Sequence, residues 1–179
     1  MKKLLILVAF LAGVVGIVAV IGAVLPRDHV VSMTVTVAAP PVRVWTTVAE
    51  VSAYPSWRSE VKSVEVLATS PLEWRENTSM GPMTLVADEF RPPSRLVARM
   101  TDEDQPFGGE WEYDIAADSS DANKTRVTIT ERGWVSNPIF RFVSKFVMGH
   151  DGTIDTYLRA LSRKFGPEAV PIALVVKDS

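Results

Sequence analysis

The feature that most constrains this chain is an unbroken apolar run near its N-terminus, from Leu4 to Leu25. The run contains no charged and no strongly polar side chain, and Lys2 and Lys3 stand directly before it. Coiled as a helix, it would be about 33 Å long, and the hydrocarbon core of a bilayer is roughly 30 Å thick. The run therefore predicts a helix that crosses a membrane once, followed from Pro26 by a domain of ordinary composition.

A cleaved secretory signal is the alternative to a retained anchor. Signal sequences usually have an apolar core of about 7–15 residues and small residues at the cleavage site. This run is longer, and its best candidate site, Ile21-Gly22-Ala23, has a bulky residue where a small one is needed. No cysteine follows it, which excludes lipid attachment to such a residue. The two lysines before the run, against Arg27 offset by Asp28 after it, predict a cytoplasmic N-terminus and an extracytoplasmic domain.

Composition excludes several classes of function. The net charge is −2, with 19 basic and 21 acidic residues, and no basic run collects in the sequence near the membrane end. This balance gives no electrostatic reason to expect nucleic acid as a partner. The absence of cysteine excludes disulfides, thiolate metal sites and cysteine nucleophiles. Only two histidines are present, and none of the common hydrolase or nucleotide-binding motifs occurs, so we expect no metal and no cofactor.

Alternation of apolar and polar residues predicts an antiparallel sheet. Residues 31–37 place apolar side chains on one strand face and hydroxyl-bearing side chains on the other. Pro40-Pro41 ends this strand and opens a short helix, and a second short helical piece ends near residue 61. Turn residues then separate further strand-like segments at 63–69, 72–79, 83–90, 95–102, 110–117 and 125–134. Short connections between consecutive strands indicate a meander.

A long amphipathic helix is predicted from Asn137 to Phe165, because apolar residues recur there at three- and four-residue spacing. Gly149 and Gly152 lie in its middle and are expected to weaken or bend it. It is the only predicted element large enough to cover the apolar face of the sheet. The pattern as a whole therefore predicts an α+β fold.

Five segments resemble those of a known superfamily: VAAPPVRVW at 37–45, VSAYPSW at 51–57, VKSVEV at 61–66, FGGEW at 107–111 and TERGWVSNP at 130–138. With the order of elements, they resemble the START/Bet v 1-like (SRPBCC) superfamily, in its polyketide cyclase/dehydrase and lipid-transport branch. The resemblance covers about residues 30–166 and implies a helix-grip fold, in which a curved antiparallel sheet wraps around a long C-terminal helix. It also implies a deep apolar cavity for lipids or other hydrophobic ligands. It does not fix an activity, because a shared fold hosts many functions.

Candidate ligand contacts follow from the strand faces and the long helix. Glu131 shares a strand face with apolar residues that are predicted to point inward, and His150 falls on the apolar face of the helix. We expect these two to form the polar end of the pocket, where they would be able to act as base and acid. The alternative is that Glu131 follows the end of its strand, that His150 faces water, and that the aromatic residues only fill a core. The remaining cavity residues are expected to be Trp111, Tyr113, Met100, Ile129, Phe146 and Ile154.

The sequence thus predicts a single-pass, membrane-anchored domain that binds a hydrophobic small molecule, a lipid or a lipid-like compound. The expected parts are a transmembrane anchor at 1–26, a helix-grip ligand-binding domain at 27–166 and a C-terminal tail at 167–179. The tail either adds an edge strand or lies against the domain. Two alternatives stay open: a cyclase- or hydratase-type enzyme that uses the same cavity, and a structural or assembly module of the membrane with a vestigial cavity. No protein partner is predicted.

Overall fold

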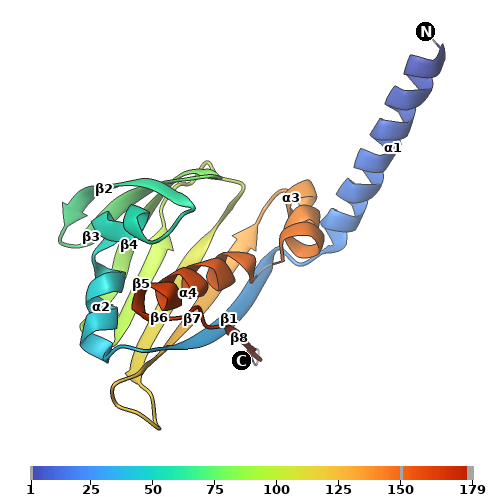
Figure 1. The fold of residues 1–179 in the computed structure, drawn as a ribbon. Coiled ribbons are helices and arrows are strands. Elements are labelled where there is room, and N and C mark those ends of the chain that lie inside the picture. Colours follow the sequence, from blue (N-terminus) through green and yellow to red (C-terminus); the bar gives the residue numbers. More distant parts are fainter. Residues whose placement is uncertain (1, 150, 177–179) are drawn as a thin grey trace.

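The computed structural model describes residues 2–149 and 151–176 of the chain. Its first element, α1 (Lys2–Val24), projects away from the rest of the molecule (Figure 1). The apolar side chains of α1 are largely exposed. Among the described helices it alone is long and apolar enough to cross a membrane, with 23 residues, or about 35 Å. Its length and composition suit a membrane anchor and a signal sequence alike, because both need an apolar helix near the N-terminus.

Eight strands form one antiparallel sheet, in the order β2-β3-β4-β5-β6-β7-β1-β8. Strands β2 to β7 follow one another as the predicted meander, and β1 returns to pair with β7, with Val31 opposite Glu131. The tail adds an edge strand, because β8 pairs with β1. The strands are β1 (Asp28–Val37), β2 (Val61–Thr69), β3 (Leu72–Thr78), β4 (Gly81–Arg91), β5 (Arg95–Met100), β6 (Phe107–Ala117), β7 (Thr125–Val135) and β8 (Ile172–Leu174).

Three helical elements pack with the sheet. The α-helix α2 (Pro41–Ala49) contacts β6, and the 3₁₀ helix η1 (Val51–Ser56) contacts β2. The C-terminal helix α4 (Gly152–Phe165) lies along the inner face of the sheet (Figure 1). One of its faces is wholly buried, because apolar residues recur along it at helical spacing. A curved antiparallel sheet around a C-terminal helix is the predicted α+β helix-grip fold, which is confirmed.

The prediction of a single helix from Asn137 to Phe165 is wrong. The segment divides into α3 (Pro138–Val143), a π-helical turn η2 (Ser144–Met148) and α4. Gly149, between the last two, has a φ of +75°, a left-handed conformation that ends a helix and that glycine adopts readily. α3 packs mainly against α1. The apolar side chains of 138–147 therefore do not cover the core of the sheet.

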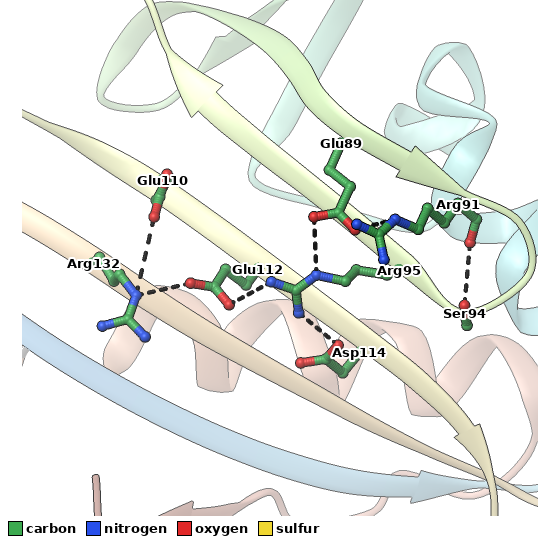
Figure 2. Close-up of polar contacts among 8 residues, drawn as sticks. All are labelled: Glu89, Arg91, Ser94, Arg95, Glu110, Glu112, Asp114 and Arg132. Atoms are coloured by element: carbon green, nitrogen blue, oxygen red, sulfur yellow. Dashed lines mark hydrogen bonds and ion pairs between the residues drawn. The ribbon is translucent and has the colours of Figure 1, made fainter. Parts of the chain in front are cut away.

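The outer face of the sheet carries a network of paired charges (Figure 2). Arg95 lies 3.2 Å from Glu89, 2.9 Å from Glu112 and 2.8 Å from Asp114, and Arg132 lies 2.8 Å from Glu112. On β6 these carboxylates alternate with inward-facing residues, as the sequence predicts. These pairs lie at the surface and are partly exposed, so each contributes only modestly to stability, but they neutralise the basic side chains of this face.

Candidate functional site

Aromatic side chains fill the interior beneath α4. Tyr157 projects from α4 toward four other aromatic rings. These are Tyr54 of η1, Trp57, which follows the end of η1, and Trp111 and Tyr113 of β6. Each of these ring centroids lies 5.3–6.3 Å from that of Tyr157, in an edge-to-face arrangement, which aromatic pairs prefer. Neither of the two hollows described below is lined by any of these rings. These rings therefore occupy the place of the deep cavity that the resemblance implies.

A charged pair is buried beside these rings. Arg58 Nη1 lies 3.2 and 3.1 Å from the two carboxylate oxygens of Glu76, which also accepts a hydrogen bond of 2.9 Å from Trp74 Nε1. The guanidinium lies 4.8 Å from the ring centroid of Tyr54 and 4.9 Å from that of Tyr157. Burial opposes the charge of Arg58, but the Glu76 carboxylate and the buried tyrosines beside it together more than offset this, so the pKa of the guanidinium lies above its ordinary value.

All three tyrosines of the chain belong to this cluster. Burial raises the pKa of Tyr54, Tyr113 and Tyr157 well above the ordinary value, so their hydroxyls stay protonated at neutral pH. The Tyr54 hydroxyl donates to the backbone oxygen of Val48 at 2.7 Å. The Tyr157 hydroxyl and Trp57 Nε1, by contrast, are buried and make no hydrogen bond of ordinary geometry within residues 2–149 and 151–176. Buried groups of this kind are rare, and each marks a place where a ligand oxygen or an ordered water would fit.

A second polar group lies at the end of the interior nearest α1. Glu131 on β7 accepts a hydrogen bond of 2.9 Å from Trp111 Nε1, and its other carboxylate oxygen lies 3.2 Å from His29 Nε2. The Thr153 hydroxyl, at the start of α4, lies 3.5 Å from the same carboxylate. Gly133 leaves room for the imidazole, because a Cβ there would come within 2.7 Å of the ring. The side chains of Glu131 and His29 are 18% and 14% exposed, so this pair is not sealed from solvent.

The structure brings five of the sequence-predicted ligand contacts to the inner face of the sheet or to α4 above it. The strand that carries Glu131 continues to Val135, so this carboxylate lies within the sheet as expected. Ile129 and Ile154 are fully buried core residues. Whether any of them binds a ligand stays a prediction. The five are Trp111, Tyr113, Ile129, Glu131 and Ile154.

The other three predicted residues have different outcomes. Phe146 is 58% exposed on η2, so its expected place on the inward face of one long helix is corrected: the break at Gly149 turns its segment toward α1. Met100, at the end of β5, shares the strand face of the buried Leu96 and Ala98, and it also lines a shallow hollow of about 250 Å³. His150 lies outside the described residues.

Sequence reasoning missed three polar residues of the interior: His29, Arg58 and Glu76. Two of them carry a usable signal. His29 stands two residues before Val31 and shares its strand face, while Glu76 stands two residues after the fully buried Trp74. In both cases strict alternation predicts an inward side chain. Arg58 follows a 3₁₀ helix and has no such pattern.

The sheet, the gripped helix and the aromatic interior define a helix-grip protein. The chain belongs to the family described as polyketide cyclase/dehydrase and lipid transport, whose model matches residues 28–165. No curated protein shows significant similarity to the sequence.

Solved structures agree with this assignment. A START superfamily protein from Mycobacterium smegmatis is 20% identical, with 76% of this chain and 97% of that chain covered and a TM-score of 0.61. The Zhui aromatase/cyclase from Streptomyces sp. R1128 is 19% identical, with 77% and 93% covered and a TM-score of 0.62. Truncated norcoclaurine synthase from Thalictrum flavum is 11% identical, with 76% and 92% covered and a TM-score of 0.61. At these identities the likeness shows the fold alone.

Proposed function

We propose that this protein is a membrane-anchored binding domain for a hydrophobic, lipid-like ligand. The observation that carries the proposal is a pair of buried groups that make no hydrogen bond of ordinary geometry among the described residues, the Tyr157 hydroxyl and Trp57 Nε1, in a fold whose family includes lipid transport. Aromatic surface supplies affinity at about 25 cal/mol per Å² of buried area, and a few polar groups orient the ligand. Glu131 adds a carboxylate that accepts a hydrogen bond from a ligand hydroxyl or N–H group.

Entry of the ligand requires movement, because side chains fill the interior. The break at Gly149 separates α4 from the segment that packs on α1. We expect α4 to swing outward about this position and the ring of Tyr157 to move with it. The Thr153 contact to Glu131 is the longest of the three at 3.5 Å, and it is therefore the contact that a ligand replaces most easily.

The anchor is part of this proposal. With α1 retained in the bilayer, and the N-terminus on the cytoplasmic side, the domain faces the extracytoplasmic side. A tethered domain meets lipids of its own membrane at high effective concentration. The anchor is tested by the intact mass of the protein extracted from membranes. A chain that keeps residues 1–26 supports it, and a chain cleaved near Ala23 contradicts it.

Photochemical cross-linking tests the ligand site. The full chain is placed in nanodiscs that contain a diazirine-bearing phospholipid, irradiated and digested, and the labelled peptides are identified. We expect label near residues 111–113, 129–131 and 153–157. Glu131→Gln should lower this labelling severalfold, while Glu65→Gln, an exposed residue of β2, should leave it unchanged. Label confined to α1 would contradict the proposal.

A structural or assembly module is the second candidate, and the filled interior favours it. Small-molecule sites are usually largely preformed, whereas α4 here packs onto Tyr54, Trp111 and Tyr113 without a large gap. The cross-linking experiment separates the two candidates. A module with a vestigial cavity yields no interior label with any lipid, and instead yields protein cross-links from the surface of the domain.

A further inference from the structure

A hollow of about 420 Å³ lies where α1 joins the domain. It is formed by the segment between α1 and β1, the end of β7, the helical segment 138–148 and the C-terminal tail. The residues that matter for its chemistry are Arg27, Asp28, His29, Arg141 and Lys145. It shares His29 with the polar group around Glu131, but it is lined by none of the aromatic residues beneath α4. We call it the junction hollow.

The junction hollow is basic, although the sequence shows no basic run there. Arg141 and Lys145 are brought beside Arg27 from more than a hundred positions away, and Asp28 is the one carboxylate among the described lining residues. None of the three cations forms an ion pair within the part of the chain that the structure describes. Arginines of the outer sheet face, such as Arg95, are instead paired (Figure 2).

Arg141 is held in place for an incoming acceptor. Its Nη1 donates to the backbone oxygen of Leu25 at 2.9 Å, and its Nη2 donates to that of Ser136 at 3.2 Å. Its Nε is buried and has no hydrogen-bond partner among the described residues. A buried cationic donor without an acceptor is costly, and an anionic oxygen in the hollow would satisfy it.

Exposed apolar side chains lie on the same helical segment as Arg141 and Lys145. On α3 and η2, Phe140 is 51%, Phe146 58% and Val147 72% exposed. This segment lies beside the last turn of α1, because a Cβ at Gly22 would come within 1.8 Å of the backbone oxygen of Pro138. Aromatic and aliphatic residues combined with arginine and lysine are typical of helices that lie in the membrane interface. The hollow thus lies at the depth of lipid headgroups when α1 spans the bilayer.

We propose that the junction hollow binds the phosphate of an anionic phospholipid headgroup. Arg141 supplies a positive charge and its unpaired Nε donor, Lys145 and Arg27 add charge, and the exposed side chains of Phe140, Phe146 and Val147 contact the acyl chains. The site rests on the proposed function only for the placement of α1 in a bilayer. It does not depend on a ligand beneath α4.

Binding is measured on the full chain in micelles of an uncharged detergent. Because the chain has no cysteine, Val147→Cys provides a single attachment point for an environment-sensitive fluorophore beside the hollow. Dioctanoyl phosphatidylglycerol is the anionic probe, dioctanoyl phosphatidylcholine the zwitterionic control, and glycerol 3-phosphate the source of free phosphate. We expect saturable binding of phosphatidylglycerol, at least tenfold tighter than that of either other compound, and weakened by salt.

Two variants and a matched control complete the test. Arg141→Gln and Lys145→Gln should each weaken phosphatidylglycerol binding about fivefold, the contribution of one basic residue near an anionic surface. Lys145→Gln removes no described hydrogen bond or ion pair, so it stays informative if Arg141→Gln disturbs the fold. Lys124→Gln with Arg126→Gln, at the far end of the β6–β7 hairpin, should change nothing.

Three results would overturn the assignment. Equal affinity for phosphatidylglycerol and phosphatidylcholine would show that the hollow does not recognise anionic charge. Glycerol 3-phosphate bound as tightly as phosphatidylglycerol would assign the hollow to a free phosphate ester instead of a lipid. Equal losses in Lys145→Gln and in the control pair would attribute the binding to overall charge. Loss of label beneath α4 in the cross-linking experiment would leave this proposal untouched.

Discussion

Alkaline titration of the full chain shows whether the interior beneath α4 is dry and filled. An ordinary tyrosine ionises near pH 10, whereas burial raises the pKa of Tyr54, Tyr113 and Tyr157 well above this value. The pKa of each tyrosine is raised only in the folded state. The free energy of unfolding therefore keeps its full value below about pH 10 and falls as the pH rises further. The loss is about 1.4 kcal/mol per pH unit for each tyrosine, or about 4 kcal/mol for three.

A domain stable by about 5–15 kcal/mol would thus unfold about one to four pH units above the ordinary tyrosine pKa. The assay follows tyrosinate absorbance and circular dichroism together, in a neutral detergent. We expect no ionisation step near pH 10, and then all three tyrosines ionising in one step with loss of structure. The chain unfolded in guanidinium is the control and should titrate normally. A tyrosine that ionises normally in the folded protein would refute the reasoning. If that ionisation step disappeared in Tyr157→Phe, the tyrosine responsible would be Tyr157.

Two substitutions test other contacts, each with a matched control. Arg58→Met leaves the Glu76 carboxylate buried without its cationic partner. In urea titrations this variant should lose about 3–5 kcal/mol of unfolding free energy. The control Arg99→Met, whose ion pair with Asp88 is exposed, should lose at most about 1 kcal/mol. Adding Glu76→Leu should recover most of the loss, and equal costs for the two arginine variants would contradict the argument. Gly22→Val should loosen α3 from α1 and raise the mobility of a spin label on α3. Gly16→Val, at a position with open space around it, should leave this mobility unchanged. Equal mobility of the label in the two variants would contradict the packing of these helices.

Local periodicity carries most of the information about the fold. Strand alternation predicts the meander, and the buried face of α4 has the spacing seen in the sequence, because both patterns depend only on neighbours a few residues apart. The break at Gly149 is harder to predict. Apolar residues on both sides of it fit one helical face, and only the packing of 138–148 against α1 decides that the segment turns away.

The candidate site depends on contacts between distant residues, and this limits prediction from sequence. The carboxylate of Glu131 is expected inward from its own strand, but its partner His29 comes from a strand 102 positions away. The pairing of β1 with β7 fixes that contact, and no local pattern encodes it. The same holds for Arg58 and Glu76, which meet because η1 packs on the first strands of the meander. The basic character of the junction hollow also depends on distant residues, because Arg141 comes beside Arg27 only when α3 packs onto α1.

Helix α1 and the polar end of the domain form one unit in space. Only residues 25–27 separate α1 from β1. α3 contacts the last turn of α1 at Gly22, and Arg141 holds the backbone of Leu25. A connection this short and this well held gives the domain little freedom, unlike a flexible linker. An anchored α1 would therefore always present the same end of the sheet to the bilayer, and that end carries Glu131, His29 and the junction hollow. The polar groups able to meet a lipid thus gather where a lipid would arrive.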